Sequence, residues 1–118
     1  MQEVATAHSA ACGWSLERYL EERCSWVIRS HFIEYLRPAF AAERIVLATW
    51  VSELAEQTSP RQYVFLREPG RQLLAKAETQ WVFVNARTGR PQHIPQTLRQ
   101  DFTPIADETK VLAWLQDP

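Results

Sequence analysis

Three side chains near the start of the chain, Glu3, His8 and Cys12, belong to the types that act as acids, bases or nucleophiles. A carboxylate can attack a carbonyl carbon or activate a water molecule, and an imidazole carries protons near neutral pH. Glu3 falls in the first turn of an expected helix, where the helix dipole favours a negative charge even without a chemical role. The sequence leaves both interpretations of Glu3 open.

His8 lies on the apolar face of the same expected helix. A histidine in that position is more often a core or pocket-lining residue than a base. Cys12 and Cys24 have neither metal-binding nor redox spacing, so we expect two reduced thiols in a cytoplasmic protein and no metal. A pair formed by Cys24 and His31 is a further candidate, but spacing along a strand does not show that the two side chains meet.

The composition narrows the class of protein. The chain has 118 residues, 46% of them hydrophobic and 23% charged, which suits one globular domain over residues 1–118. The net charge is −1 and the 13 basic residues are scattered, whereas nucleic-acid binding needs a concentrated basic face. No apolar run approaches the roughly 20 residues that cross a bilayer, and no signal-peptide pattern is present. We therefore expect neither a nucleic-acid nor a membrane partner.

The first quarter of the chain predicts two helices, over residues 2–12 and 16–22. Gly13 supplies a residue that ends the first helix at positive φ, and Ser15 is a suitable N-cap for the second. The first helix has no capping residue ahead of it, which suggests that the natural element begins upstream of Met1. The alternative is that Met1 is the true start and the first turn frays.

The middle of the chain predicts four β-strands, over residues 26–36, 44–51, 61–67 and 72–84. Alternation in the third places Tyr63 and Phe65 on one face and Val64 and Leu66 on the other. Because the connections are short, consecutive strands are expected to pair in an antiparallel meander.

The last predicted strand carries Leu73, Ala75 and Ala77 on one face, where the small alanines allow a helix to approach closely. A short helix is expected over residues 96–101, and Asp107 caps a final one. Helices gathered at the start of the chain indicate an α+β fold, with the N-terminal helix across a curled antiparallel sheet. Such a sheet leaves edges exposed, so a homodimer or homotetramer is expected.

Several segments carry a family resemblance, the strongest being residues 25–39 with the pattern Tyr35-x-x-Pro38-Ala39. The others are residues 2–8, 44–51, 74–84 and 88–95. In this order they resemble the hotdog-fold acyl-CoA thioesterases of the 4-hydroxybenzoyl-CoA thioesterase type. One departure lies in the helix, where Thr6 replaces the arginine usual in a Glu-Ala-Arg signature.

A second departure concerns the catalytic acid. The resembled proteins begin with a β-strand and an Asp-bearing loop ahead of the helix, and neither precedes Met1. The resemblance therefore implies an α-β4 domain without its first strand. This is expected if the chain is truncated, if its true start lies upstream, or if the domain has lost its activity.

The resemblance implies hydrolysis of an acyl-CoA thioester at a subunit interface, without a cofactor. Glu3 is the remaining candidate acid. The acyl pocket is expected to involve His8, Cys12 and Trp26. Cations near the nucleotide are expected to be Arg61, Arg67, Arg90 and His93; they would equally suit a solvated strand edge. The alternatives to an enzyme are a non-catalytic domain that binds acyl-CoA or another small ligand, and an assembly protein with a closed pocket.

Overall fold

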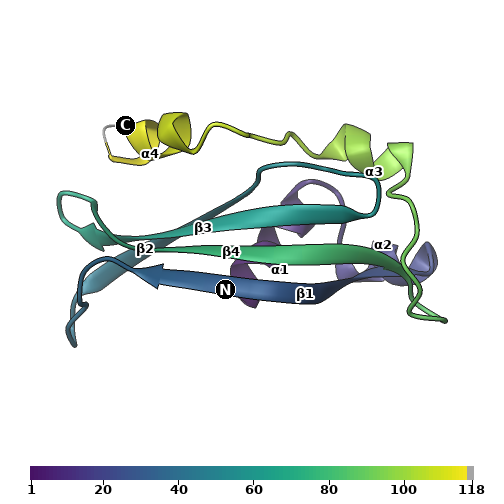
Figure 1. The fold of residues 1–118 in the computed structure, drawn as a ribbon, viewed down its shortest axis with the longest axis horizontal. Helices are drawn as coiled ribbons and strands as arrows, with labels where there is room; N and C mark the ends of the chain where they lie inside the picture. The colour runs from purple at the N-terminus through teal and green to yellow at the C-terminus, as the bar shows by residue number, and fades with distance from the viewer. Residues whose placement is uncertain (117–118) are drawn as a thin grey trace.

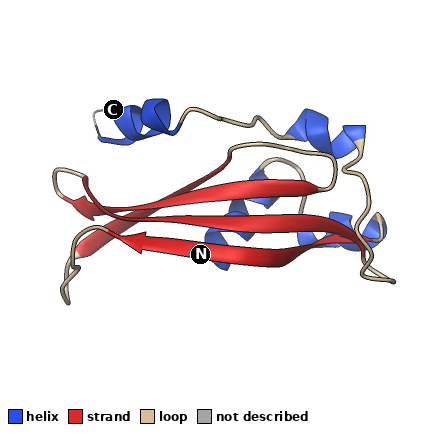
Figure 2. Cartoon of the chain, in the orientation of Figure 1, coloured by secondary structure: helices blue, strands red, loops and turns tan. Residues whose placement is uncertain are grey.

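The computed structural model describes residues 1–116, which form an antiparallel sheet with helices on both faces (Figure 1). Helix α1 lies across one face, α4 covers the other, and α2 and α3 lie at one end. Figure 2 shows the strands as one curled layer between the helices. The predicted α+β, hotdog-like architecture is confirmed. The elements are α1 (Gln2–Ala11), α2 (Leu16–Glu21), β1 (Cys24–Tyr35), β2 (Arg44–Val51), β3 (Thr58–Glu68), β4 (Gln72–Asn85), α3 (Gln96–Asp101) and α4 (Glu108–Gln116).

Helix α1 ends at Gly13 as predicted. Gly13 has φ of +95°, a conformation that side chains with a Cβ adopt only with strain. The amide of Gly13 donates to the Ala10 carbonyl at 3.0 Å, and that of Trp14 donates to the Ser9 carbonyl at 2.9 Å. These two bonds form a Schellman motif, which turns the chain so that Trp14 is buried.

The starts of two helices also agree with the sequence prediction. The Ser15 hydroxyl accepts a hydrogen bond from the Arg18 amide at 3.2 Å and caps α2. The Asp107 carboxylate accepts from the Thr109 amide at 3.0 Å and from the Lys110 amide at 3.4 Å at the start of α4. Within residues 1–116, no helix has the length and apolar character needed to cross a membrane.

The order of the strands corrects the predicted meander. The observed order is β1-β4-β3-β2, so β1 pairs with β4 rather than with β2. The connection over residues 36–43 is long enough for this crossing, since eight residues reach about 26 Å and three strand spacings amount to about 14 Å. Only β2, β3 and β4 follow one another as hairpins, and β1 lies at the free edge beyond β4.

The alternation predicted for β3 separates two cores, one on each face of the sheet. On the α1 side, Tyr63 packs with Ala5 and Ala77, and Phe65 adjoins them. On the α4 side the core is formed by Trp50, Val64, Leu66 and Leu115, with Val111 and Leu112 against it. The apolar side chains of α4 therefore face the sheet.

The side predicted for Leu73 is wrong. The β3–β4 register pairs Leu66 with Leu73 but Phe65 with Ala75, so Leu74 is an extra residue in β4. This bulge reverses which face of the sheet the β4 side chains before Leu74 point toward. Leu73 consequently packs on the α4 side, whereas Ala77 faces α1.

The contact between Ala5 and Ala77 predicts a steric test. Ala77 is 4% exposed beneath α1, so Ala77→Leu adds volume that α1 must move to accommodate. We expect the free energy of unfolding in urea to fall by about 1–3 kcal/mol. The exposed helix residue Ala113, changed to Leu, is the matched control and should shift it by less than about 0.5 kcal/mol. Equal unfolding midpoints for both variants would contradict tight packing at this contact.

Candidate functional site

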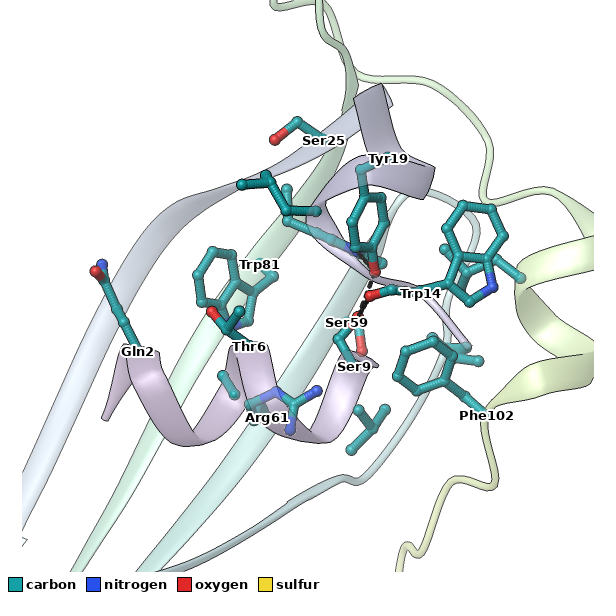
Figure 3. A pocket seen from close by; sticks show the side chains of 16 residues that line it. Gln2, Thr6, Ser9, Trp14, Tyr19, Ser25, Ser59, Arg61, Trp81 and Phe102 are labelled. Atoms are coloured by element: carbon teal, nitrogen blue, oxygen red, sulfur yellow. Dashed lines mark hydrogen bonds between the residues drawn. The ribbon is translucent and has the colours of Figure 1, made fainter. Parts of the chain in front are cut away.

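A cavity of about 300 Å³ lies between α1 and the sheet (Figure 3). Helix α1 contributes one face of its surface, α2 and β1 close one side, and β3 and β4 form the floor. Phe102 and Leu98 close the end near α3. The cavity is lined by Gln2, Ala5, Thr6, Ser9, Trp14, Leu16, Tyr19, Ser25, Trp26, Val51, Leu54, Ser59, Arg61, Trp81, Leu98 and Phe102.

Arg61 is the charged residue of this cavity, and it is only 6% exposed. Its Nη1 donates to His8 Nδ1 at 2.9 Å and to Thr49 Oγ1 at 3.3 Å. Burial lowers the pKa of Arg61, but a guanidinium remains protonated in proteins. The lining contains neither Asp nor Glu. The cavity therefore has a mixed lining of apolar and uncharged polar side chains, with one positive charge in its wall.

The bond from Arg61 determines the tautomer of His8. Arginine only donates, so His8 Nδ1 must accept and the ring proton lies on Nε2. That Nε2 lies 3.6 Å from Cys12 Sγ, toward which it donates. Burial, and then the charge of Arg61, lower the pKa of His8, while burial raises the pKa of the Cys12 thiol. His8 is thus held neutral and Cys12 is not an activated nucleophile.

A chain of hydrogen bonds orders the polar side of the cavity. The Ser9 hydroxyl donates to the Trp14 carbonyl at 2.9 Å, so at the 2.7 Å contact the Tyr19 hydroxyl donates to Ser9. Trp26 Nε1 in turn donates to the Tyr19 oxygen at 3.1 Å. Burial raises the pKa of Tyr19, which keeps it a neutral phenol. These contacts hold Tyr19 and Trp26 in place as walls of the cavity.

The three residues predicted for the acyl pocket separate in the structure. Trp26 lines the cavity, as expected. His8 and Cys12 do not line it; they form the layer behind Arg61. Glu3 is exposed and lies 100° around α1 from Gln2, just outside the face that lines the cavity.

The four predicted coenzyme A cations do not gather at one place. Arg61 is inside the cavity, whereas Arg67 lies six residues further along β3, about 20 Å away, and pairs with Glu43. Arg90 and His93 are exposed on the segment that follows β4. Sequence alone placed Arg61 and Arg67 on one strand but did not show that only one of them enters the space under α1.

Sequence reasoning also missed the polar residues that line the cavity from α1. Gln2, Thr6 and Ser9 follow one another at intervals of four and three residues, which is one face of a helix. The spacing is visible in the sequence, but the prediction was based on the neighbouring apolar face of the helix, which includes His8. Within the described part of the chain, no group of three or more His, Cys, Asp or Glu side chains is placed to hold a metal ion.

The neutral state of His8 predicts a pH dependence of stability. Its folded-state pKa lies below the ordinary value of 6.5, so below pH 6.5 the unfolded chain binds a proton that the folded chain does not. The free energy of unfolding should therefore fall as pH decreases from 6.5 toward the folded-state pKa, with a slope of at most about 1.4 kcal/mol per pH unit. Urea unfolding across this range measures the slope.

The variant His8→Gln keeps an acceptor for Arg61 but does not titrate, so it should lose this part of the slope. The control variant His93→Gln, at an exposed position, should retain the part of the slope that depends on His8. An unchanged slope in His8→Gln would show that another group is responsible.

Comparison with known proteins gives the family context of this cavity. The chain is 29% identical over 79 residues to the chloroplastic acyl-[acyl-carrier-protein] hydrolase FATB3 of Cuphea viscosissima. That match covers 67% of this chain and 19% of the relative, so this chain spans only a small part of the relative's length.

Solved structures show the same fold at low identity. The gentisyl-coenzyme A thioesterase BH1999 has a TM-score of 0.70 at 18% identity, over 86% of this chain and 78% of that one. The DHNA-CoA thioesterase of Staphylococcus aureus has a TM-score of 0.73 at 16% identity, over 95% of this chain and 72% of that one. The predicted hotdog thioesterase fold is confirmed, while membership of the 4-hydroxybenzoyl-CoA type stays a prediction. The sequence model of the acyl-ACP thioesterase N-terminal domain matches residues 1–102, and this chain therefore belongs to that family.

Proposed function

We propose that this chain binds an acyl thioester with the acyl group in the cavity under α1 and takes part in its hydrolysis. The observation that carries the proposal is the cavity itself, about 300 Å³ between a helix and a sheet. That volume is at the small end of ligand sites, which suits an acyl group rather than a whole coenzyme. Ala5, Val51 and Leu54 supply apolar wall for its methylene groups.

The start of α1 is the proposed position of the thioester. Gln2, from the first turn, lines the cavity at this end. The first amides of α1 receive no side-chain cap, which leaves them free to stabilise negative charge on a carbonyl oxygen. A thioester carbonyl here would be polarised by the amides and the positive end of the helix dipole.

Glu3 is the proposed acid. The lining formed by the described residues contains no carboxylate, so an acid supplied by this chain would reach the thioester from the rim. Glu3 is the acidic residue of the first turn of α1, and Thr6, three positions later, lines the cavity. Glu3 is exposed, and none of the ion pairs found within residues 1–116 includes it. Its carboxylate is therefore free to turn toward a bound thioester.

Coenzyme A is the proposed carrier, with Arg90 and His93 as cations for its phosphates. Both side chains are exposed, and a guanidinium forms charge-assisted hydrogen bonds with phosphate oxygens. An acyl carrier protein is the competing carrier, because the plant relative is named as a hydrolase of acyl-carrier-protein thioesters. Measuring the hydrolysis rate of the same acyl group attached to coenzyme A and to an acyl carrier protein distinguishes the two carriers. We also retain the expectation of a cytoplasmic protein, which rests on the free thiols of Cys12 and Cys24.

A homodimer through β1 is the proposed assembly. Strand β1 is 12 residues long and lies at the edge of the sheet. Phe32 and Tyr35 on it are 65% and 78% exposed, and Val27 and Ile28 are also exposed. A long apolar edge strand is a template for pairing with another strand, so a second copy of β1 would cover it. Because Ser25 and Trp26 line the cavity, this interface would lie beside the acyl site.

A non-catalytic acyl-binding domain is the second candidate function. The lack of a carboxylate in the cavity lining favours it, since binding needs only the apolar walls and the charge of Arg61. The two candidates differ in turnover and agree in ligand binding, so both quantities must be measured.

Filling the cavity with a larger side chain tests the acyl site. Thr6→Trp places an indole where Thr6 lines the cavity, and we expect at least a tenfold loss of binding of a non-hydrolysable acyl-CoA analogue, about 1.4 kcal/mol. Calorimetry measures the dissociation constant. Ala7→Trp is the matched control, because Ala7 is exposed on α1 and does not line the cavity. Equal losses in both variants would contradict binding under α1.

The role of Glu3 predicts a separation of turnover from binding. Glu3→Gln should lower hydrolysis of acyl-CoA, followed by a thiol reagent, by about 100-fold or more, with analogue binding unchanged. Glu17→Gln, at an exposed acidic position in the first turn of α2, should leave turnover unchanged. Full activity in Glu3→Gln would show that Glu3 is not the catalytic acid and that it only interacts favourably with the helix dipole.

A further inference from the structure

We propose that Arg61 recognises a carboxylate at the distal end of the acyl group, so that the preferred substrates are thioesters of dicarboxylic acids. The inference rests on the proposed function, since it takes the cavity under α1 as the acyl site. It concerns which acyl group the cavity selects, and it comes from the position of one charge in a lining that is otherwise uncharged.

The position of Arg61 suits the far end of an acyl chain. Figure 3 shows Arg61 beneath α1 between Thr6 and Ser9, while Gln2 stands at the opposite end of the helix. His8, which accepts a hydrogen bond from Arg61, is six residues beyond Gln2, a separation of about 9 Å along the helix axis. A chain that starts at the first turn of α1 and follows the cavity therefore reaches the guanidinium at its other end.

The charge of Arg61 has no anionic partner within residues 1–116. None of the described ion pairs includes it, and both acceptors on Nη1, His8 Nδ1 and Thr49 Oγ1, are neutral. The phenols of Tyr19 and Tyr63 are nearby, and burial raises the pKa of both, which keeps them uncharged. A buried charge is costly unless it is paired. A ligand anion in the cavity would supply the missing partner.

The free edge of the guanidinium fits a carboxylate. Both described side-chain bonds are made by Nη1, which leaves Nε and Nη2 without a described partner. These two nitrogens form the parallel fork that binds the two oxygens of a carboxylate. Other parts of the lining are apolar, including Ala5, Val51 and Leu54, and suit the methylene groups between thioester and carboxylate. A methyl-terminated chain would instead place its apolar end against the charge.

Paired non-hydrolysable ligands test the proposal without depending on turnover. Each is an acyl-CoA analogue with a methylene group between sulfur and carbonyl, prepared with succinyl, glutaryl and adipyl chains and with methyl-terminated chains of equal length. We expect wild type to bind at least one carboxylate-terminated analogue tenfold or more tightly than its methyl-terminated partner, as measured by calorimetry. Arg61→Met should abolish or reverse this preference, and Arg61→Lys should reduce it because the fork is lost.

Arg44→Met is the matched control, since Arg44 is exposed at the start of β2 and should leave the preference unchanged. Circular dichroism and thermal unfolding establish whether Arg61→Met folds. If it does not, the preference of wild type and its reduction in Arg61→Lys still decide the matter.

The outcomes separate this inference from the proposed function. A tenfold preference for a carboxylate-terminated analogue without turnover of any thioester would sustain the role of Arg61 and contradict hydrolysis. Turnover of alkyl thioesters, with equal binding of the paired analogues, would sustain hydrolysis and overturn the role of Arg61. No binding of either analogue would overturn both.

Discussion

The close approach of α1 to the sheet is the contact on which the rest of the site depends. Ala5 on the helix packs in one cluster with Tyr63 of β3 and Ala77 of β4, while the backbone of α1 approaches the sheet mainly at β2. Beyond this contact the layers diverge enough to leave a cavity of about 300 Å³. Interiors are packed too tightly for such a space to close or open by small adjustments. A larger residue at the contact would therefore shift every side chain that α1 contributes to the cavity.

A single buried cation distinguishes this otherwise uncharged cavity chemically. Arg61 is held by His8 and Thr49, and in return it holds His8 in its neutral form with the proton on Nε2. Both Nη1 acceptors are uncharged, and none of the ion pairs within residues 1–116 includes Arg61. Arg61 supports α1 through its bond to His8 and, as proposed above, also selects the ligand that enters the cavity.

The two faces of the sheet have different roles. The α4 face is covered within the chain by Leu115 and its neighbours against Val64 and Leu66, and it forms an ordinary core. The α1 face carries the cavity. Toward β1 the sheet ends in an unpaired edge with exposed Phe32 and Tyr35, next to residues that line the acyl site. Site and edge therefore lie side by side, so an assembly through β1 would also enclose the mouth of the cavity.

Sequence alone determined the local features, because each depends on neighbouring residues. The Gly13 helix end, the Ser15 and Asp107 caps and the two faces of β3 follow from backbone freedom, short-range hydrogen bonds and alternation. Tertiary structure decided what depends on distant partners. The pairing of β1 with β4, the bulge at Leu74 and the entry of Arg61 rather than Arg67 into the cavity arise from contacts between segments far apart in the chain. Periodicity shows which residues share a face, but only packing shows what that face meets.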